Sequence, residues 1–400
     1  MSSRRRRTRS PALTPLEDDD LLCEILLRIP PQPSSLPRAS AVCKRWRGLV
    51  SDPGFSRRFR LHHRRNPPLL GFFHRFGGRS FVSTLEPPNC IPPERLSLQR
   101  DDYFEGSMSL GCRHGLYLIW LPKPRQVLVW DPITGDKHHI AVPAPFNTEN
   151  TLVNGAVLRD AGDVQHFQVV VVVVDGSNDQ HIQASTCIYS SKTSLWGNLI
   201  STPIPYEDNM SRFRLHTSFA TEALLAGDSL YWKLAGNLVG ILEFDLVKQS
   251  LAMIWVPVNM LGVGKSIKIM RAKGGGLGCF VVSESDCTVQ LWKRKIDCRD
   301  VASWELAKTI EMDKILSLKP EEKGNLYVLG FAEENNAVLM WTMIGLFMIH
   351  LDSLKVSRVL VAEMQKWLVG CRFFRFVCFE AEIDPLCSIH WSAVKWTCRN

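Results

Sequence analysis

Three short motifs in this 400-residue sequence carry side chains that could do chemistry. The segment NMLGVGKS at 259–266 imitates the end of a phosphate-binding loop, but an asparagine stands where the first glycine is required. Glu333-Glu334 are adjacent carboxylates in polar surroundings, and neighbours on a strand point to opposite faces, so we expect a solvated loop rather than an acid–base pair. His138-His139 follow a turn and have no identifiable partners for metal ligation. These motifs predict no catalytic residue.

The cysteines do not supply a metal site either. Twelve are scattered from Cys23 to Cys398, and no C-x-x-C pair occurs, so we expect no structural zinc and no cofactor. The basic start of the chain is followed by proline and aspartate rather than by an apolar run, which argues against a secretory signal. We therefore expect reduced thiols in a protein of the cytoplasm, the nucleus or both.

The most apolar stretch, AVLMWTMIGLFMIHL at 337–351, is a poor candidate for a membrane span. It is shorter than the ~20 residues that a helix needs to cross a bilayer. It is better explained as two buried strands that meet at a turn near Ile344-Gly345. No membrane partner is expected.

The net charge of +8 is concentrated at the N-terminal end. Residues 1–75 carry +10, and the remaining residues carry −2. The arginine runs at 4–7 and 57–65 could form a phosphate-binding or nuclear-targeting surface. A solvated tail and a solvated helix face are the interpretation that we favour, so nucleic acid is not the partner we expect.

These features require elements to position them, and the clearest elements are short helices at residues 16–53. Asp18, Asp19 and Asp20 supply an N-cap and negative charge for the first helix. Its apolar side chains recur at the spacing of a single stripe: Leu21, Leu22, Ile25, Leu26 and Ile29. Pro30-Pro31 end this helix.

A second helix is expected after the proline-rich break. Ser34 or Ser35 can cap it, and its apolar positions are Ala39, Val42, Cys43, Trp46, Leu49 and Val50. Asp52-Pro53 repeats the cap signal for a third, shorter helix. The segment is too small to bury a core alone, which favours docking on a partner; the alternative is a helical hairpin packed on its own downstream domain.

Beyond these helices, the sequence is rich in strands that come in pairs. Two-strand units are expected at 116–135, 166–189, 229–246, 277–294 and 326–351, with a sixth at 69–85. They recur every ~50 residues, which is the period of kelch-like propeller blades. Residues from about 363 no longer follow this pattern and are expected to form a divergent closing strand and tail.

The helical segment resembles an F-box of the form found in large plant families. The resemblance covers about residues 13–60 and rests on DDLLCEILLRIPP followed by SSLPRASAVCKRWRGLVSDPGF. The sequence departs from the family at its start, where Leu16-Glu17-Asp18 replace the usual Leu-Pro.

The resemblance implies that the box binds a Skp-family adaptor and joins a cullin-RING ubiquitin ligase. The chain would then be a non-catalytic subunit, and large apolar side chains would carry the contact. The adaptor-binding residues that we predict are Leu21, Leu22, Ile25, Leu26, Ile29, Pro30, Leu36, Val42, Cys43, Trp46, Leu49 and Val50.

The strand-rich region is similar to the associated domain of plant F-box proteins, through phrases such as VLVWDPITG, GDSLYWKL and ILEFDL. That likeness implies a β-propeller that binds an unknown substrate protein. The predicted fold is thus α+β and multidomain: a basic tail (1–12), an all-α F-box (13–60), a linker (61–68), an all-β, kelch-like β-propeller-type domain (69–362) and a divergent C-terminal tail (363–400). The alternative function is a non-ligase β-propeller that binds proteins or glycans.

Overall fold

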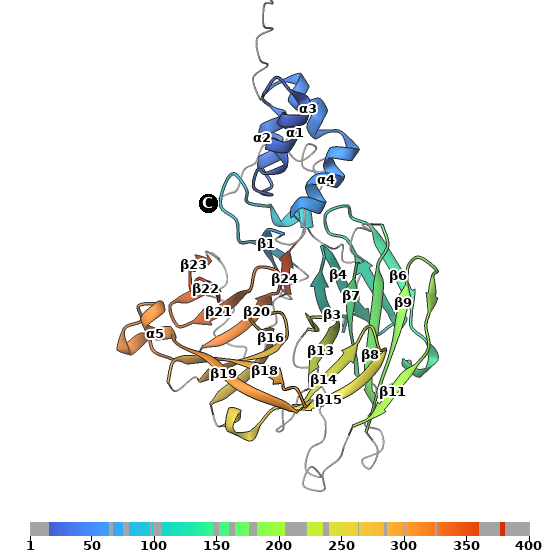
Figure 1. Cartoon of the computed structure of the whole chain (residues 1–400), viewed down its shortest axis with the longest axis vertical. Helices are drawn as coiled ribbons and strands as arrows, with labels where there is room; N and C mark the ends of the chain where they lie inside the picture. The colour runs from blue at the N-terminus through green and yellow to red at the C-terminus, as the bar shows by residue number, and fades with distance from the viewer. Residues whose placement is uncertain are drawn as a thin grey trace, which may run out of the picture. The chain divides into compact units, whose positions relative to one another are not determined.

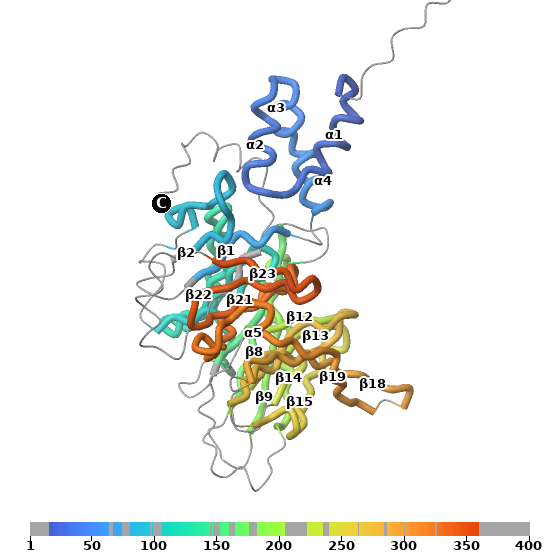
Figure 2. The backbone as a smooth tube through the Cα atoms, turned by 90° about the vertical axis from the view of Figure 1, so that its left-hand side faces the viewer, coloured from blue at the N-terminus to red at the C-terminus, as the bar shows by residue number. Residues whose placement is uncertain are grey.

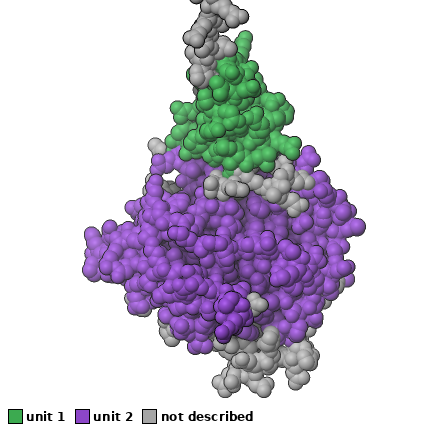
Figure 3. Space-filling view, in the orientation of Figure 1, with its two compact units in different colours: residues 1–66, 87–90, 382–400 green, residues 67–86, 91–381 purple. Residues whose placement is uncertain are grey.

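The computed structural model describes residues 16–63, 67–74, 80–96, 98, 106–146, 152–159, 165–175, 182–204, 222–234, 240–262, 264–283, 286–299, 301–324, 326–359 and 377–380. They fall into two compact units, which Figure 3 colours separately. We call them the helical unit, with residues 16–63 and 87–90, and the sheet unit, which holds the other described residues.

The helical unit contains four helices where the sequence predicted three. They are α1 (Asp19–Leu27), α2 (Ser35–Ser40), α3 (Lys44–Val50) and α4 (Pro53–His63). The predicted N-cap is confirmed, because the Asp18 carboxylate accepts hydrogen bonds from the backbone N–H groups of Asp20 (2.9 Å) and Leu21 (3.1 Å). The last helix is not short: it has 11 residues and begins where the Asp52 carboxylate accepts the N–H of Phe55 (2.7 Å).

The prediction of a single second helix is wrong, because the helix is interrupted between Ser40, where α2 ends, and Lys44, where α3 begins. Cys43 is fully extended (φ −161°, ψ 170°), and its Sγ accepts the N–H of Trp46 at 3.5 Å as the cap of α3. Ser40 Oγ donates to the carbonyl of Pro37 at 2.7 Å, a local bond of the kind that competes with helix continuation. The apolar positions assigned to one stripe therefore belong to two helices and the turn between them.

The sheet unit consists of antiparallel strands and a few short helical turns. The strands are β1 (Leu69–His74), β2 (Ser80–Ser83), β3 (Met108–Arg113), β4 (Leu116–Leu121), β5 (Gln126–Trp130), β6 (Lys137–Ala141), β7 (Leu152–Leu158), β8 (Gln168–Asp175), β9 (Gln183–Ser190), β10 (Leu195–Trp196), β11 (Ile200–Pro203), β12 (Leu224–Ala226), β13 (Ser229–Lys233), β14 (Gly240–Asp245), β15 (Ser250–Trp255), β16 (Lys265–Arg271), β17 (Leu277–Ser283), β18 (Thr288–Ile296), β19 (Ala302–Glu311), β20 (Tyr327–Ala332), β21 (Ala337–Thr342), β22 (Gly345–His350), β23 (Val356–Val359) and β24 (Val377–Glu380). The helical turns are η1 (Pro93–Leu96), η3 (Ala144–Phe146), η5 (Val258–Met260), α5 (Met312–Ile315) and η6 (Pro320–Glu322).

The described strands form six sheets, and five of these consist of strands that are consecutive in the chain. Four sheets have four strands each, β3–β6, β12–β15, β16–β19 and β20–β23, and the β7–β11 sheet has five. A sixth sheet has three strands in the order β2-β1-β24 (Figure 1). The structure thus confirms an all-β propeller with five full blades and the expected additional unit near residue 69.

The predicted two-strand units are the central pairs of these sheets. The pairs β4–β5, β8–β9, β13–β14 and β17–β18 are antiparallel neighbours, and β21–β22 meet at the expected turn before Gly345. These strands are identifiable because both faces are apolar; every residue of β17, for example, is buried. A strand buried on both faces has an almost continuous apolar sequence.

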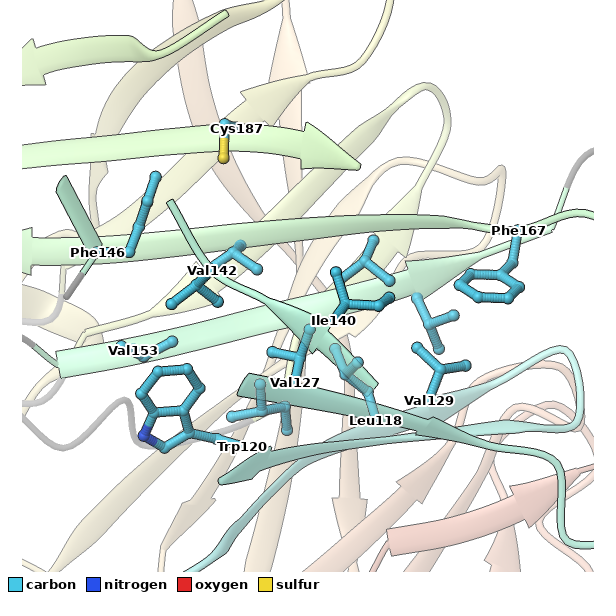
Figure 4. Close-up of a cluster of buried hydrophobic side chains, with 14 of the residues drawn as sticks. Leu118, Trp120, Val127, Val129, Ile140, Val142, Phe146, Val153, Phe167 and Cys187 are labelled. Carbon is cyan, nitrogen blue, oxygen red and sulfur yellow. The ribbon is translucent and has the colours of Figure 1, made fainter. Parts of the chain in front are cut away.

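The apolar core lies between the sheets rather than in one central mass. Figure 4 shows the cluster between the β3–β6 and β7–β11 sheets, where Trp120, Phe146 and Phe167 pack with valines from both. A cluster of this kind lies between each of the next pairs in the chain. Phe72 of β1 packs against the β20–β23 sheet, and Phe73 packs on Tyr117 and Trp130. The sheets therefore follow one another around a closed ring.

The sixth sheet closes the ring with strands from opposite ends of the domain. Strand β24 pairs with β1 between Phe73↔Val377 and Leu69↔Glu380, and it also contacts β3 and β20. Pairing of the first and last strands is the usual way in which a propeller removes its open edges. The closing strand lies within the segment for which the sequence predicted a divergent closing strand and tail.

The prediction that Glu333-Glu334 form a solvated loop is wrong. Glu333 is 16% exposed and accepts hydrogen bonds from Arg113 of β3, at 2.5 Å to Oε1 and 3.2 Å to Oε2. Glu334 lies 3.4 Å from Arg271 of β16. These carboxylates therefore join three sheets through ion pairs.

The next two residues of the same turn make further links. Asn335 Nδ2 donates to the carbonyl of Pro67, and Asn336 Nδ2 donates to Asp352 (3.0 and 2.9 Å). We call residues 333–336 the EENN turn. Each of its four residues ties the turn to a different part of the sheet unit.

Candidate functional site

Arg45 joins the start of α1 to the start of α3 in the helical unit. Its guanidinium donates to the Asp19 carboxylate (2.8 Å) and to the backbone carbonyls of Leu16 and Glu17 (2.7 Å each). A planar guanidinium with several donors suits such a three-point contact. The segment that departs from the F-box pattern, Leu16-Glu17-Asp18, is thereby held in place by its backbone.

Four apolar side chains are exposed on or beside the elements that Arg45 joins. Leu21 and Ile25 lie one turn apart on α1 and are 49% and 42% exposed. Leu16, which precedes α1, is 48% exposed, and Val42, in the turn before α3, is 61% exposed. We call these four residues the exposed apolar face. Of the four, Leu21 and Ile25 share one side of α1, and exposed apolar side chains on a small module typically mark a site of protein contact.

The predicted adaptor-binding residues divide into three groups. Leu21, Ile25, Pro30, Val42 and Cys43 are exposed; Ile29, Trp46 and Leu49 are half-buried; Leu22, Leu26, Leu36 and Val50 are buried. The buried four pack with Leu27, Ala39, Phe55 and Phe59 in the internal core of the helical unit. These four side chains are at most 4% exposed, so in this structure they form part of the core of the helical unit; a direct contact with an adaptor stays a prediction for them.

The expectation that this segment could not bury a core is corrected by the same cluster, because α4 adds two phenylalanines to it. The single apolar stripe predicted on α1 is in fact two. Successive helical residues are rotated by about 100°, so Leu21 and Ile25 face outward while Leu22 and Leu26 face inward. The two pairs have the same spacing in the sequence, and only the packing of α2, α3 and α4 against one side of α1 distinguishes them.

Polar contacts fix α4 against α1 and position the exposed apolar face. Glu24 binds Arg28 (2.8 Å) and Arg58 of α4 (3.0 Å), and the hydrogen bond from Arg28 lowers the pKa of Glu24. At the other end of α1, the Nε2 atom of His63 lies 2.8 Å from the carbonyl oxygen of Leu27. Burial lowers the pKa of His63, which favours the neutral ring whose Nε2–H donates this bond.

Two positioning residues were missed by the sequence analysis. No local pattern distinguishes Arg45 from the neighbouring cations Lys44 and Arg47. Asn89, far along the chain, accepts the N–H of Ser34 at 3.0 Å and donates to Gln32 at 3.0 Å, so it stabilises the start of α2. No sequence signal connects residues 55 positions apart.

Within the described ranges, no cluster of three or more histidine, cysteine, aspartate or glutamate side chains is placed to hold a metal ion. Among the same residues, no helix combines the length and the apolar character that crossing a membrane requires. The glycine-containing segment at 259–266 runs directly into β16 rather than into a helix, so it lacks the strand–loop–helix context of a phosphate-binding loop.

Comparison with known families agrees with this architecture. The model described as "F-box protein AT5G49610-like, beta-propeller" matches residues 109–374, and the model described as "F-box-like" matches residues 19–62. The second range coincides with helices α1 to α4. F-box domains generally bind Skp1-type adaptors.

Individual proteins are more distant. F-box protein At5g03970 of Arabidopsis thaliana is 25% identical over 257 residues, which are 60% of this chain and 58% of that protein. The match thus spans less than two thirds of the relative's length.

Solved structures resemble the chain only loosely. Apo AztD from Citrobacter koseri (12% identity, TM-score 0.32) covers 72% of this chain and 92% of its own. The WD40 domain of SCAP from fission yeast (9%, TM-score 0.31) covers 66% of this chain and 56% of its own. Likeness at this level supports no argument. The family models carry more weight, because one spans more than half of the chain and the other spans its four N-terminal helices. This chain belongs to the AT5G49610-like family of F-box proteins with a β-propeller.

Proposed function

We propose that this chain is a substrate-receptor subunit of a Skp-cullin-F-box ubiquitin ligase. The helical unit binds a Skp-family adaptor, and the propeller binds the target protein. The adaptor links the chain to a cullin-RING ligase, so the bond-forming chemistry belongs to other subunits. This chain contributes proximity, because it raises the effective concentration of the target near the conjugating enzyme.

The observation that carries the proposal is the exposed apolar face on a module that already has its own core. The side chains of the exposed apolar face are not needed to fold the unit, because Leu22, Leu26 and Phe59 form part of its internal core. Leaving large apolar side chains in water has no benefit for an isolated protein, and burying them in a partner's groove is favourable. Leu21 and Ile25 are therefore the anchors that we propose.

The decisive experiment is co-purification of the full-length chain with a Skp-family adaptor. Interface anchors typically cost at least 2 kcal/mol when lost, so Leu21→Asp and Ile25→Asp should each weaken the complex roughly thirtyfold or more. Val247→Asp is the matched control, because Val247 is a 75% exposed apolar residue in the sheet unit. The control variant should bind the adaptor as the wild type does.

Folding must be separated from binding in this experiment. Leu22→Asp places a charge in the internal core and should unfold the helical unit, with a loss of helical circular dichroism. Leu21→Asp should keep that signal. If Leu21→Asp and Ile25→Asp stay folded and still bind the adaptor at wild-type affinity, the exposed apolar face is not the contact.

The proposal includes a location in the cytoplasm, the nucleus or both. A fluorescent fusion of the full-length chain tests this part separately. A fusion confined to the secretory pathway, or to any organelle other than the nucleus, would contradict it without affecting the binding result.

A further inference from the structure

Lys233 is the last residue of β13, in the region where the β12–β15 sheet packs against the β16–β19 sheet (Figure 2). It lies opposite Ile241 of β14 and on the same face as Tyr231, because side chains alternate along a strand. Tyr231 and Ile241 both belong to the apolar cluster between the two sheets. The side chain of Lys233 therefore extends along an apolar layer.

The ammonium group of Lys233 has no compensating charge among the described residues. Its one electrostatic neighbour there is Cys279 of β17, which is fully buried. Burial raises the pKa of Cys279 to about 12, so this thiol stays neutral at physiological pH. A buried cation without an anionic partner is costly, and a lysine in such a position can lose its proton instead.

The carboxylates on this face of the described strands β12 to β18 are held by other groups. Glu243 lies opposite Tyr231, about 7 Å along the strand from the position of Lys233, and accepts the Tyr231 hydroxyl at 2.7 Å. Asp245, one pairing farther away, accepts two backbone N–H groups of the turn that follows it (3.0 and 2.7 Å). The other charged side chains on the face of these strands are cations, which oppose a further positive charge: Lys265, Arg271 and Arg294.

The amine of Lys233 is both accessible and unusually ready to lose its proton. Lys233 is half-buried, and its Nζ atom is not fully enclosed, so a small molecule can reach it. Burial lowers the pKa of Lys233, so a larger fraction of its amine is neutral at physiological pH than in an exposed lysine. Only the neutral amine has the free electron pair that attacks a carbonyl group, and desolvation is one of the ways in which proteins activate a lysine for this reaction.

We propose that Lys233 binds a small apolar aldehyde covalently, as an imine, in the layer between the two sheets. The amine nitrogen attacks the carbonyl carbon, and the carbonyl oxygen leaves as water together with the two protons of the amine. A C=N bond replaces the C=O bond, so the step needs neither an oxidant nor a reductant. The surrounding side chains, Tyr231, Ile241 and Cys279, favour an apolar chain on the aldehyde.

The test exposes the full-length chain to butanal at neutral pH, reduces the imine with cyanoborohydride and maps the adducts by mass spectrometry of peptides. The adduct on Lys233 should form at least tenfold faster than the adduct on Lys248, because more of the Lys233 amine is neutral. Lys248 is the matched control, since it is exposed and lies 3.2 Å from the Asp245 carboxylate. In denaturant, the two lysines should react at equal rates.

The pH dependence distinguishes an activated amine from a lysine whose stem packs on apolar side chains while its ammonium group stays in water. Labelling of Lys248 should rise about tenfold for each pH unit up to about pH 10, whereas labelling of Lys233 should level off at a lower pH. Lys233→Met should remove the fast adduct and keep the tryptophan fluorescence of the folded chain. Lys248→Arg should leave adduct formation on Lys233 unchanged.

Three outcomes overturn the proposal: labelling of Lys233 no faster than that of Lys248, a parallel rise of the two rates with pH, or no adduct on Lys233 in the folded chain. The inference goes beyond the proposed function and does not depend on it. Lys233→Met should still co-purify with the adaptor, and Leu21→Asp should still form the adduct on Lys233.

Discussion

Replacing Arg113 by methionine tests whether the EENN turn holds the propeller together. Arg113 is 6% exposed and donates to both oxygens of Glu333 and to the carbonyl of Ala223 (2.8 Å), so it bridges β3, the turn before β21 and the start of β12. Without the guanidinium, the nearest remaining cation to Glu333 is Arg271 at 4.0 Å. Leaving a buried carboxylate without its partner costs about 3–5 kcal/mol.

That loss should be visible in the unfolding of the sheet unit. For a domain of this size, it corresponds to a fall of roughly 6–10 °C in the unfolding temperature. Tryptophan fluorescence is the appropriate signal, because eight of the twelve tryptophans, at 120, 130, 196, 232, 255, 292, 304 and 341, lie in the described strands of this unit. Adaptor binding by the helical unit should not change.

The double variant Arg113→Met with Glu333→Leu tests whether the loss of stability comes from the unpaired Glu333 carboxylate. It removes both charges, so it should be more stable than Arg113→Met alone, by about 2 kcal/mol or more. Glu305→Gln is the control, because Glu305 of β19 is exposed and its ion pairs with Lys293 and Lys295 lie at the surface; this variant should leave the unfolding temperature unchanged. If Arg113→Met costs less than about 1 kcal/mol, or if the two single variants add without coupling, the buried ion pairs do not hold the sheets together.

Two further predictions concern the ends of the units. Burial lowers the pKa of His63 below 6.5, so the unfolded state binds the proton more readily than the folded state. The free energy of unfolding of the helical unit, measured by chemical denaturation, should therefore be constant above pH 6.5 and should fall as the pH is lowered below that value. The fall should be smaller in His63→Gln. In β1, a Cβ at Gly71 would collide with the carbonyl oxygen of Val82, so Gly71→Ala should destabilise the sheet unit by about 1–3 kcal/mol in chemical denaturation, whereas Gly276→Ala, with open space around it, should not.

The parts of the fold that were predictable are those whose signal is local. The central strand pairs are recognisable in the sequence as apolar runs such as QVVVVVVD in β8, and the start of α1 is recognisable from its N-cap residue Asp18. The outermost strands gave no such signal. In β6, only Ile140 of five residues is buried, so the polar sequence KHHIA resembles a loop.

The candidate site was predictable in location but not in detail. The residues that hold it depend on contacts between distant segments: Arg45 with Leu16, and Asn89 with Ser34. The same limit explains the error at Glu333, because its partner Arg113 lies 220 positions earlier in the chain. A polar turn next to a strand has the same local sequence whether water or a buried arginine meets it.

The pairing of β24 with β1 has a consequence for synthesis of the chain on the ribosome. The ring cannot close until residue 380 has left the exit tunnel. Until then the five full sheets lack β24, the strand that pairs with β1 and contacts both β3 and β20. During that interval, unpaired edges are open to neighbouring chains, which is the situation in which holding chaperones matter most. A message truncated between codons 360 and 376 would yield a protein that has every strand of the five full sheets but lacks β24, so the ring stays open, and such a product should be recognised and degraded as misfolded.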